Sequence, residues 1–264
     1  MQLKKYSNFR IPCKKDGNDG DSLLWAGLMH LSTQNPHSDF VMPILDSQSP
    51  DGRFWRAPSR VCNQSKNSFS RDMAVGLIAA ASVEKKSNFK PITKAANKWI
   101  KYVQRNGCAC PDAEDNRCKM TPAVYWLASY AGIKVPWWYA ITKLLLIPYL
   151  FVASLSAPRG YPRHLIAVMI LVLRSLGVNS VILDTVAKNL STSDSLNPFF
   201  KYLAYGKSAN VYKMLLSMEL EALSNNQGKV SQWSWERADY EMAHLDSMGW
   251  EFDFMHNCLK NLNI

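Results

Sequence analysis

Three acidic residues stand where helices are predicted to begin: Asp21, Asp72 and Glu236. An acidic side chain in the cap or first turn of a helix accepts hydrogen bonds from free backbone N–H groups and complements the helix dipole, which is a purely structural role. A pair of carboxylates at the rim of one cleft can instead act as general acid and base on a glycosidic bond. We therefore treat all three as candidate catalytic residues.

Arginine and tryptophan side chains cluster in the same parts of the chain. A guanidinium pairs with carboxylate, sulfate or phosphate, and an indole offers a flat face to a sugar ring. The segment DGRFWRAPSR, residues 51–60, is the densest example and has no evident packing role. The candidate substrate-binding residues are Trp25, Asp51, Arg53, Trp55, Arg56, Arg60, Arg71, Trp233 and Arg237.

We expect one cleft to hold four residues of these two groups, namely Asp21, Arg56, Arg71 and Asp72. The basic side chains favour an acidic polysaccharide or another polyanion as partner, ahead of nucleic acid. A protein partner also fits.

Three of the six cysteines, Cys108, Cys110 and Cys118, lie close together in a polar stretch. Three thiolates could ligate zinc with one distant histidine, but the paired CxxC spacing of zinc knuckles is missing. A disulfide that closes the loop and free thiols are equally open alternatives. The chain has no Walker loop, GxGxxG motif or HExxH motif. We therefore expect neither a metal nor a cofactor.

The chain of 264 residues has a formal net charge of +10, and the positive charge is spread along the sequence. Residues 120–218 carry 9 basic and 2 acidic side chains, whereas residues 219–253 carry 2 basic and 8 acidic ones. A basic patch could form in the fold and attract nucleic acid, an acidic polysaccharide or a membrane surface. The alternative is that the lysines between Lys85 and Lys101 only form the solvated face of amphipathic helices.

Helical periodicity dominates after residue 20 and predicts an all-α fold. Apolar residues recur near every 3.6 positions in the stripes that begin at Leu24 and Phe89. Residues 35–66 are polar, lack a period and are predicted as one long loop, a kind of segment that often carries function. The length fits a single domain, residues 1–264. Further helices are predicted at 71–83, 122–131, 137–155, 163–176, 178–190, 208–224, 236–246 and 250–261.

Two of these predicted helices, 137–155 and 163–176, are apolar enough to raise the question of a membrane. Lys143 would cost about 2.5–3.5 kcal/mol at a bilayer centre, and Pro148 interrupts the first helix. The second has too short an uninterrupted apolar run for a span. We expect the two to pack as antiparallel core helices, with a membrane-inserted hairpin as the alternative.

Five motifs together resemble the helical-hairpin proteins of the (α/α) six-hairpin toroid type. They are DGDSLLWAGL, DGRFWRAPSR and NSFSRDMAVGL in the first third of the chain, and WSWERADY and SMGWEFDFMHN near its end. This resemblance implies helical hairpins arranged as a toroid, and a glycoside hydrolase or polysaccharide lyase activity. The chain is shorter than a full toroid normally requires, which implies a partial one, and no catalytic pair carries over by position.

Two other classes of function stay open from the sequence. A toroid fold also suits a non-enzymatic structural or host-interaction protein of a virus or mobile element, because function resides in the site and not in the fold. The apolar segments could instead form a membrane-active helical hairpin. No secretory signal is visible near the N-terminus, so we expect a cytoplasmic or virion-associated protein.

For a glycan-processing enzyme, the substitution Asp72→Asn is predicted to abolish turnover and leave the fold intact. Asparagine keeps the size and still caps a helix, but it neither donates nor accepts a proton at neutral pH, so turnover should fall by about a hundredfold or more. A panel of acidic and neutral glycans, assayed for reducing ends and for the unsaturated product of a lyase, measures this. Well-folded wild-type protein that neither binds nor cleaves any of them would point to the non-enzymatic class.

Overall fold

The computed structural model describes residues 3–6, 9–12, 22–61, 69–109, 119–224 and 250–262 of the chain. These residues are mostly helical, which confirms the predicted all-α class. They form two compact units, one reaching as far as Leu145 and the other beginning at Leu146.

The first unit consists of helices, 3₁₀ turns and one β-hairpin. The predicted loop at 35–66 contains a short helix and a 3₁₀ turn, while residues 62–68 lie outside the described part of the chain. The elements are β1 (Leu3–Tyr6), β2 (Phe9–Pro12), α1 (Ser22–Thr33), α2 (Val41–Leu45), η1 (Pro58–Arg60), α3 (Arg71–Val83), η2 (Glu84–Lys86), α4 (Pro91–Asn106), α5 (Pro122–Tyr130), α6 (Trp137–Thr142) and η4 (Lys143–Leu145). The two strands pair antiparallel.

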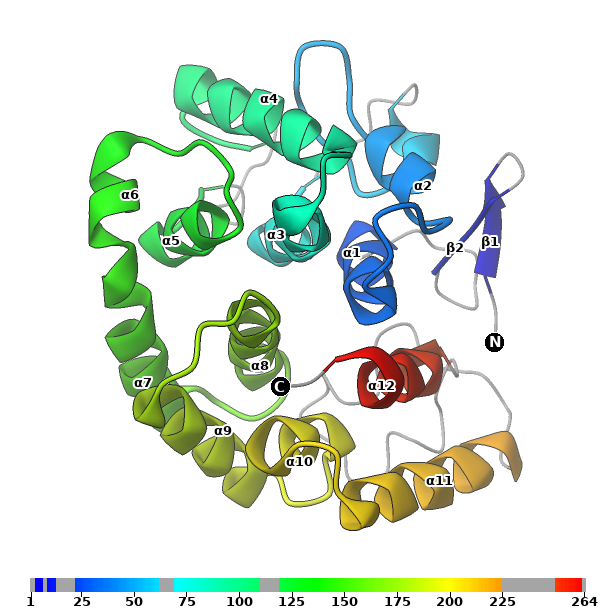
Figure 1. Ribbon diagram of the computed structural model, residues 1–264. Helices are drawn as coiled ribbons and strands as arrows, with labels where there is room; N and C mark the ends of the chain where they lie inside the picture. Colours follow the sequence, from blue (N-terminus) through cyan, green and yellow to red (C-terminus); the bar gives the residue numbers. More distant parts are fainter. Residues whose placement is uncertain are drawn as a thin grey trace. The chain divides into compact units, whose positions relative to one another are not determined.

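Helices α1 and α3 form the core of the first unit and lie side by side in Figure 1. Both are buried along almost their whole length. A Cβ added at Gly27 would lie 2.0 Å from the carbonyl oxygen of Gly76, and one added at Gly76 would lie 2.4 Å from the Cα of Leu24. Glycine is the residue that permits so close an approach of two backbones, so this pair sets the distance between the helices.

The second unit is also helical. Its described elements are α7 (Leu146–Ser156), α8 (Tyr161–Ser175), α9 (Val181–Ser193), α10 (Pro198–Tyr205), α11 (Ala209–Ser224) and α12 (Trp250–Asn261). The predicted helix at 236–246 lies outside the described residues.

No helix was predicted from the sequence at 198–205, where α10 lies, because an Asn-Pro pair such as Asn197 and Pro198 usually marks a turn. They are the start of a helix: the Asn197 side-chain oxygen accepts hydrogen bonds from the N–H groups of Phe199 and Phe200, at 3.0 and 3.1 Å. Pro198 occupies the first helical position, where its missing N–H has no consequence. The pair that signals a turn in the sequence therefore begins a helix here.

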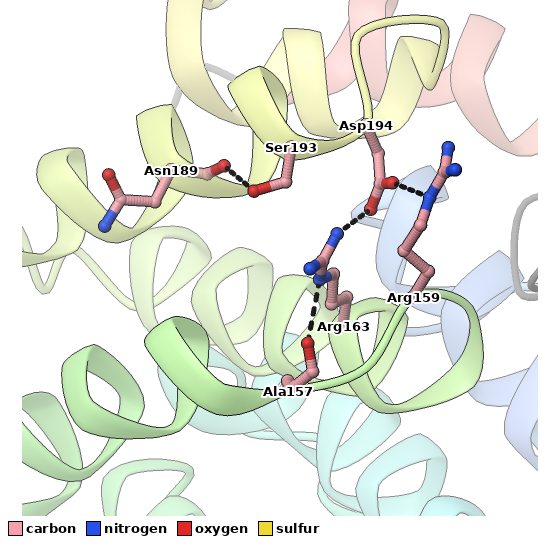
Figure 2. Close-up of polar contacts among 6 residues, drawn as sticks. All are labelled: Ala157, Arg159, Arg163, Asn189, Ser193 and Asp194. Atoms are coloured by element: carbon pink, nitrogen blue, oxygen red, sulfur yellow. Dashed lines mark hydrogen bonds and ion pairs between the residues drawn. The ribbon is translucent and has the colours of Figure 1, made fainter.

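An ion-pair cluster joins the turn before α8 to the end of α9 (Figure 2). Asp194, 1% exposed, accepts from the guanidinium groups of Arg159 at 2.8 Å and Arg163 at 3.1 Å. Arg163 also donates to the Ala157 carbonyl oxygen, at 3.0 Å. Because a buried carboxylate needs such partners, this cluster fixes the connection between α7 and α8 against α9.

The prediction that residues 137–155 form a core helix was wrong. No side chain of α6 is buried. By length and composition Trp137–Ser156 could cross a membrane, but only 17% of an apolar stretch of 18 residues within it is buried. In contrast, α8 is buried through Ala167–Leu173, because α7, α9 and α10 all contact it. Apolar composition predicted burial for both segments, but neighbours cover only one of them.

The substitution Gly27→Ala should destabilise the chain by about 3 kcal/mol or more, because the added methyl group collides with backbone atoms that no rotamer change can move. Urea unfolding measures the loss. Gly132→Ala is the matched control: its φ of +83° costs about 1 kcal/mol for an L-residue, and no atom lies within 4 Å of the new Cβ. Equal losses for the two variants would contradict the role assigned to the Gly27–Gly76 contact.

Candidate functional site

Of the three candidate catalytic residues, Asp72 falls in the described part of the chain. It lies in the first turn of α3 and is partly exposed. Ser70 occupies the N-cap position with an extended backbone, but its side chain makes no capping hydrogen bond. The acid/base pair and the shared cleft therefore stay predictions. Outside the described residues lie Asp21, Trp233, Glu236 and Arg237.

The described tryptophans of the candidate set belong to the core. Trp25 is 0% exposed in α1, and Trp55 is 3% exposed. The Trp55 indole N–H donates to the Ser49 hydroxyl, and the Arg53 guanidinium carbon lies 4.0 Å from the ring centroid of Trp55. Neither indole offers an open face to a sugar from solvent. The expectation that DGRFWRAPSR has no packing role was therefore wrong.

Residues 47–57 form a folded loop, called the 47–57 loop below. The Ser49 N–H donates to the Arg53 carbonyl oxygen at 2.8 Å, and the Gly52 N–H donates to the Ser49 carbonyl oxygen at 3.0 Å. The Asp51 carboxylate accepts from the Arg53 N–H at 3.0 Å. These bonds close a tight turn whose tip, at Asp51, is exposed.

The turn of the 47–57 loop packs directly on α4. Gly52 adopts a φ of +100°, and a Cβ there would lie 2.9 Å from the Lys98 carbonyl oxygen. The Gln48 side chain donates to the Ala95 carbonyl oxygen at 2.8 Å, and the Arg105 guanidinium donates to the Asp51 carbonyl oxygen at 3.1 Å. Because both bonds join the turn to the helix, the turn and α4 are held in a fixed relative position.

An open groove of about 530 Å³ lies where the 47–57 loop meets α4. This volume falls within the usual range for ligand sites. Three exposed cations face one carboxylate, so the groove is positively charged. It is lined by Pro50, Asp51, Gly52, Lys98, Lys101, Gln104 and Arg105, and we call it the α4 groove.

The cations of the α4 groove were not among the predicted site residues, although the sequence contains their signal. Lys94, Lys98, Lys101 and Arg105 recur at spacings of four, three and four, which places them along one side of a helix. The sequence left open whether such cations form a basic patch or only the solvated face of an amphipathic helix. What it did not indicate is that the turn at Asp51 borders this face and gives it a wall.

A buried acid positions the start of α4. Glu84, 0% exposed, accepts from the N–H of Ile92 at 2.9 Å and from the N–H and hydroxyl of Thr93 at 2.8 and 2.9 Å. Burial raises the pKa of the Glu84 carboxyl above its ordinary value, and the backbone N–H of Thr93 opposes that rise. The folded chain thus holds this proton more tightly than the unfolded chain, so protonation of Glu84 favours folding as the pH falls through the raised pKa.

Three other arginines of the predicted set lie at the end of the 47–57 loop, in η1 and at the start of α3. The Arg56 carbonyl oxygen accepts from the Leu23 N–H at 3.1 Å, which joins the end of the 47–57 loop to the start of α1. Arg60 ends η1, and Arg71 is exposed as the first residue of α3. Of the predicted substrate-binding residues in the described part of the chain, Asp51 is the one that lines the α4 groove.

Cys108 is disulfide-bonded, so it is not one of the free thiols that the sequence left open. Cys110 and Cys118 lie outside the described residues. Within the described ranges, no group of three or more His, Cys, Asp or Glu side chains is placed to hold a metal ion.

Two further grooves, of about 490 and 450 Å³, adjoin Ser208 in the second unit. One is lined by a single cation, Lys201, and the other by Lys207 and Lys260. The Lys207 ammonium donates to the Lys260 carbonyl oxygen at 3.4 Å, and the Lys201 ammonium lies 5.6 Å from the ring centroid of Tyr205. The α4 groove, with its exposed row of cations, is therefore the stronger candidate site.

The substitution Glu84→Ala should destabilise the chain by about 3 kcal/mol, because it leaves buried N–H donors without an acceptor. Amide hydrogen exchange in the first turn of α4 should accelerate at the same time. Glu84→Gln retains one acceptor oxygen and should lose less. A Glu84→Ala variant with wild-type stability and unchanged exchange would contradict the positioning role.

Comparisons with known proteins reveal no relative of this chain. No protein-family model matches it, and neither does any curated protein or solved structure. The resemblance to (α/α) six-hairpin toroid proteins therefore rests on the sequence motifs alone.

Proposed function

We propose that this chain binds an acidic polysaccharide in the α4 groove. The observation that carries this proposal is the row of exposed cations on α4 beside the turn at Asp51. Lys98 and Arg105 are seven residues apart, which corresponds to about 10 Å along a helix axis. Lys101 lies between them, so the groove offers positive charges at short, repeated intervals. A polymer with carboxylate or sulfate groups at repeated intervals complements this pattern.

The lining of the groove argues against single-stranded nucleic acid and against recognition of a sugar by stacking. Proteins that bind single strands usually stack the bases on aromatic rings. No aromatic side chain is among the described residues that line the α4 groove, and the nearby Trp55 and Tyr102 are buried. Charge pairing and hydrogen bonding remain as the means of recognition, and both suit a uronate or sulfated glycan.

We further propose that the helices form an (α/α) toroid or part of one. Two motifs of the resemblance coincide with the described helices α1 and α3, as expected for successive hairpins of such a fold. Glycan binding requires no catalytic pair and is compatible with both an enzyme and a non-enzymatic host-interaction protein. Turnover by Asp21, Asp72 and Glu236 stays a separate prediction.

The double substitution Lys98→Ala and Lys101→Ala should weaken binding of an acidic glycan by about tenfold or more, because it removes two of the three cations of the groove. Isothermal titration with heparin and with polygalacturonate at low ionic strength measures the change. Since charge pairing is screened by salt, wild-type affinity should also fall as salt rises.

The matched control is Lys188→Ala with Lys213→Ala, which removes two exposed lysines from the second unit. The control therefore has the same net charge as the test variant. This control should bind the glycans as the wild type does. Equal losses in both variants would show that net charge and not the groove attracts the ligand. Tighter binding to a DNA oligonucleotide than to either glycan would show that the ligand of the groove is nucleic acid and not a polysaccharide.

A further inference from the structure

Helix α6 and the following turn η4 expose large apolar side chains to solvent. Trp137 is 70% exposed, Ile141 68% and Leu144 67%. Trp138 and Leu145 are each 50% exposed. A soluble protein rarely leaves so many large apolar side chains uncovered in so short a stretch, and such patches usually mark a binding surface.

The opposite side of this segment is held by α5. The Trp126 indole N–H donates to the Thr142 hydroxyl at 2.9 Å, and Tyr125 stacks on Tyr139 with 4.5 Å between ring centroids. The Lys143 ammonium lies 5.3 Å from the ring centroid of Tyr130. The exposed residues therefore belong to a helix anchored on one side and open on the other.

The sequence around α6 and η4 carries charges of a single sign. No Asp or Glu occurs between Asp115 and Asp184, whereas seven Lys and Arg do. One of them, Lys134, is exposed just before α6. An apolar surface flanked in the sequence by basic residues complements the headgroups of anionic lipids, which attract basic side chains close to a membrane.

We infer that α6 and η4 bind the surface of a membrane that contains anionic lipids. Trp137 and Trp138 suit this location, because tryptophan prefers the boundary between headgroups and hydrocarbon. Ile141 and Leu144 reach the acyl chains, as the apolar face of an interfacial helix does.

The segment lies along the membrane and does not cross it. Its contacts with α5 would have to break before it could span the bilayer. The chain continues into α7, which contacts α9 and buries Leu146 and Leu150, while Tyr149 and Val152 stay exposed. Each part of Trp137–Ser156 thus keeps one side on protein.

A second copy of the chain fits this surface less well than a lipid surface does. Two copies that meet through α6 would bring like charges together, and the sequence supplies no acidic residue between Asp115 and Asp184 to neutralise them. Like charges across an interface oppose association.

The test is flotation of the purified full chain with vesicles of phosphatidylcholine alone and of phosphatidylcholine with about one quarter phosphatidylserine. The wild type should float with the anionic vesicles and bind the neutral ones at least about fivefold more weakly. The triple substitution Trp137→Ser, Ile141→Ser and Leu144→Ser should lower the partition coefficient by about tenfold or more. Lys134→Glu should weaken binding to the anionic vesicles and leave binding to the neutral vesicles unchanged.

The control substitutes three exposed apolar residues elsewhere, Met42→Ser, Leu196→Ser and Leu220→Ser, and should bind as the wild type does. Circular dichroism establishes that every variant is folded. Wild-type protein that fails to float with anionic vesicles, or a triple variant that floats as well as the wild type, overturns the inference. Self-association that the triple variant abolishes, without vesicle binding, would instead assign the surface to a second copy.

Discussion

The backbone contact between Gly27 and Gly76 is the constraint on which the first unit depends. The start of α1 is bonded to the end of the 47–57 loop through Leu23 and Arg56, and α3 leads directly into η2, where Glu84 caps α4. The two walls of the α4 groove are therefore attached to two helices that touch. A wider separation of α1 and α3 would move the loop relative to α4, so the tight packing of two glycines sets the geometry of a polar surface some distance from them.

Helix α4 combines a buried acid at its beginning with a row of cations along its exposed side. Glu84 is removed from solvent, and its hydrogen bonds go to backbone N–H groups and a threonine. It therefore stabilises the start of the helix, while Lys98, Lys101 and Arg105 line the α4 groove further along the same helix.

The prediction from periodicity was accurate for α3, whose limits at 71 and 83 agree with it although the helix is buried along almost its whole length. It was less informative for 137–155, because an apolar segment shows no preferred face and its burial depends on neighbours distant in sequence. The segment around Trp55 was misjudged because its polar residues suggested a solvated loop, whereas hydrogen bonds within the loop allow its aromatic side chain to be buried. The α4 cations were visible as a stripe, but the turn at Asp51 that borders them is a tertiary feature.

In the second unit, the hydroxyl of Tyr202 on α10 donates to the carbonyl oxygens of Cys258 and Leu262, at 3.2 and 3.0 Å. The Cys258 thiol is free and 0% exposed, and burial raises its pKa. Because alkylating reagents react with the thiolate, this cysteine is chemically silent while α12 stays docked. The rate at which Cys258 is alkylated, measured on the peptide that contains it, therefore reports how often α12 detaches. No reporter group has to be introduced into the protein beforehand.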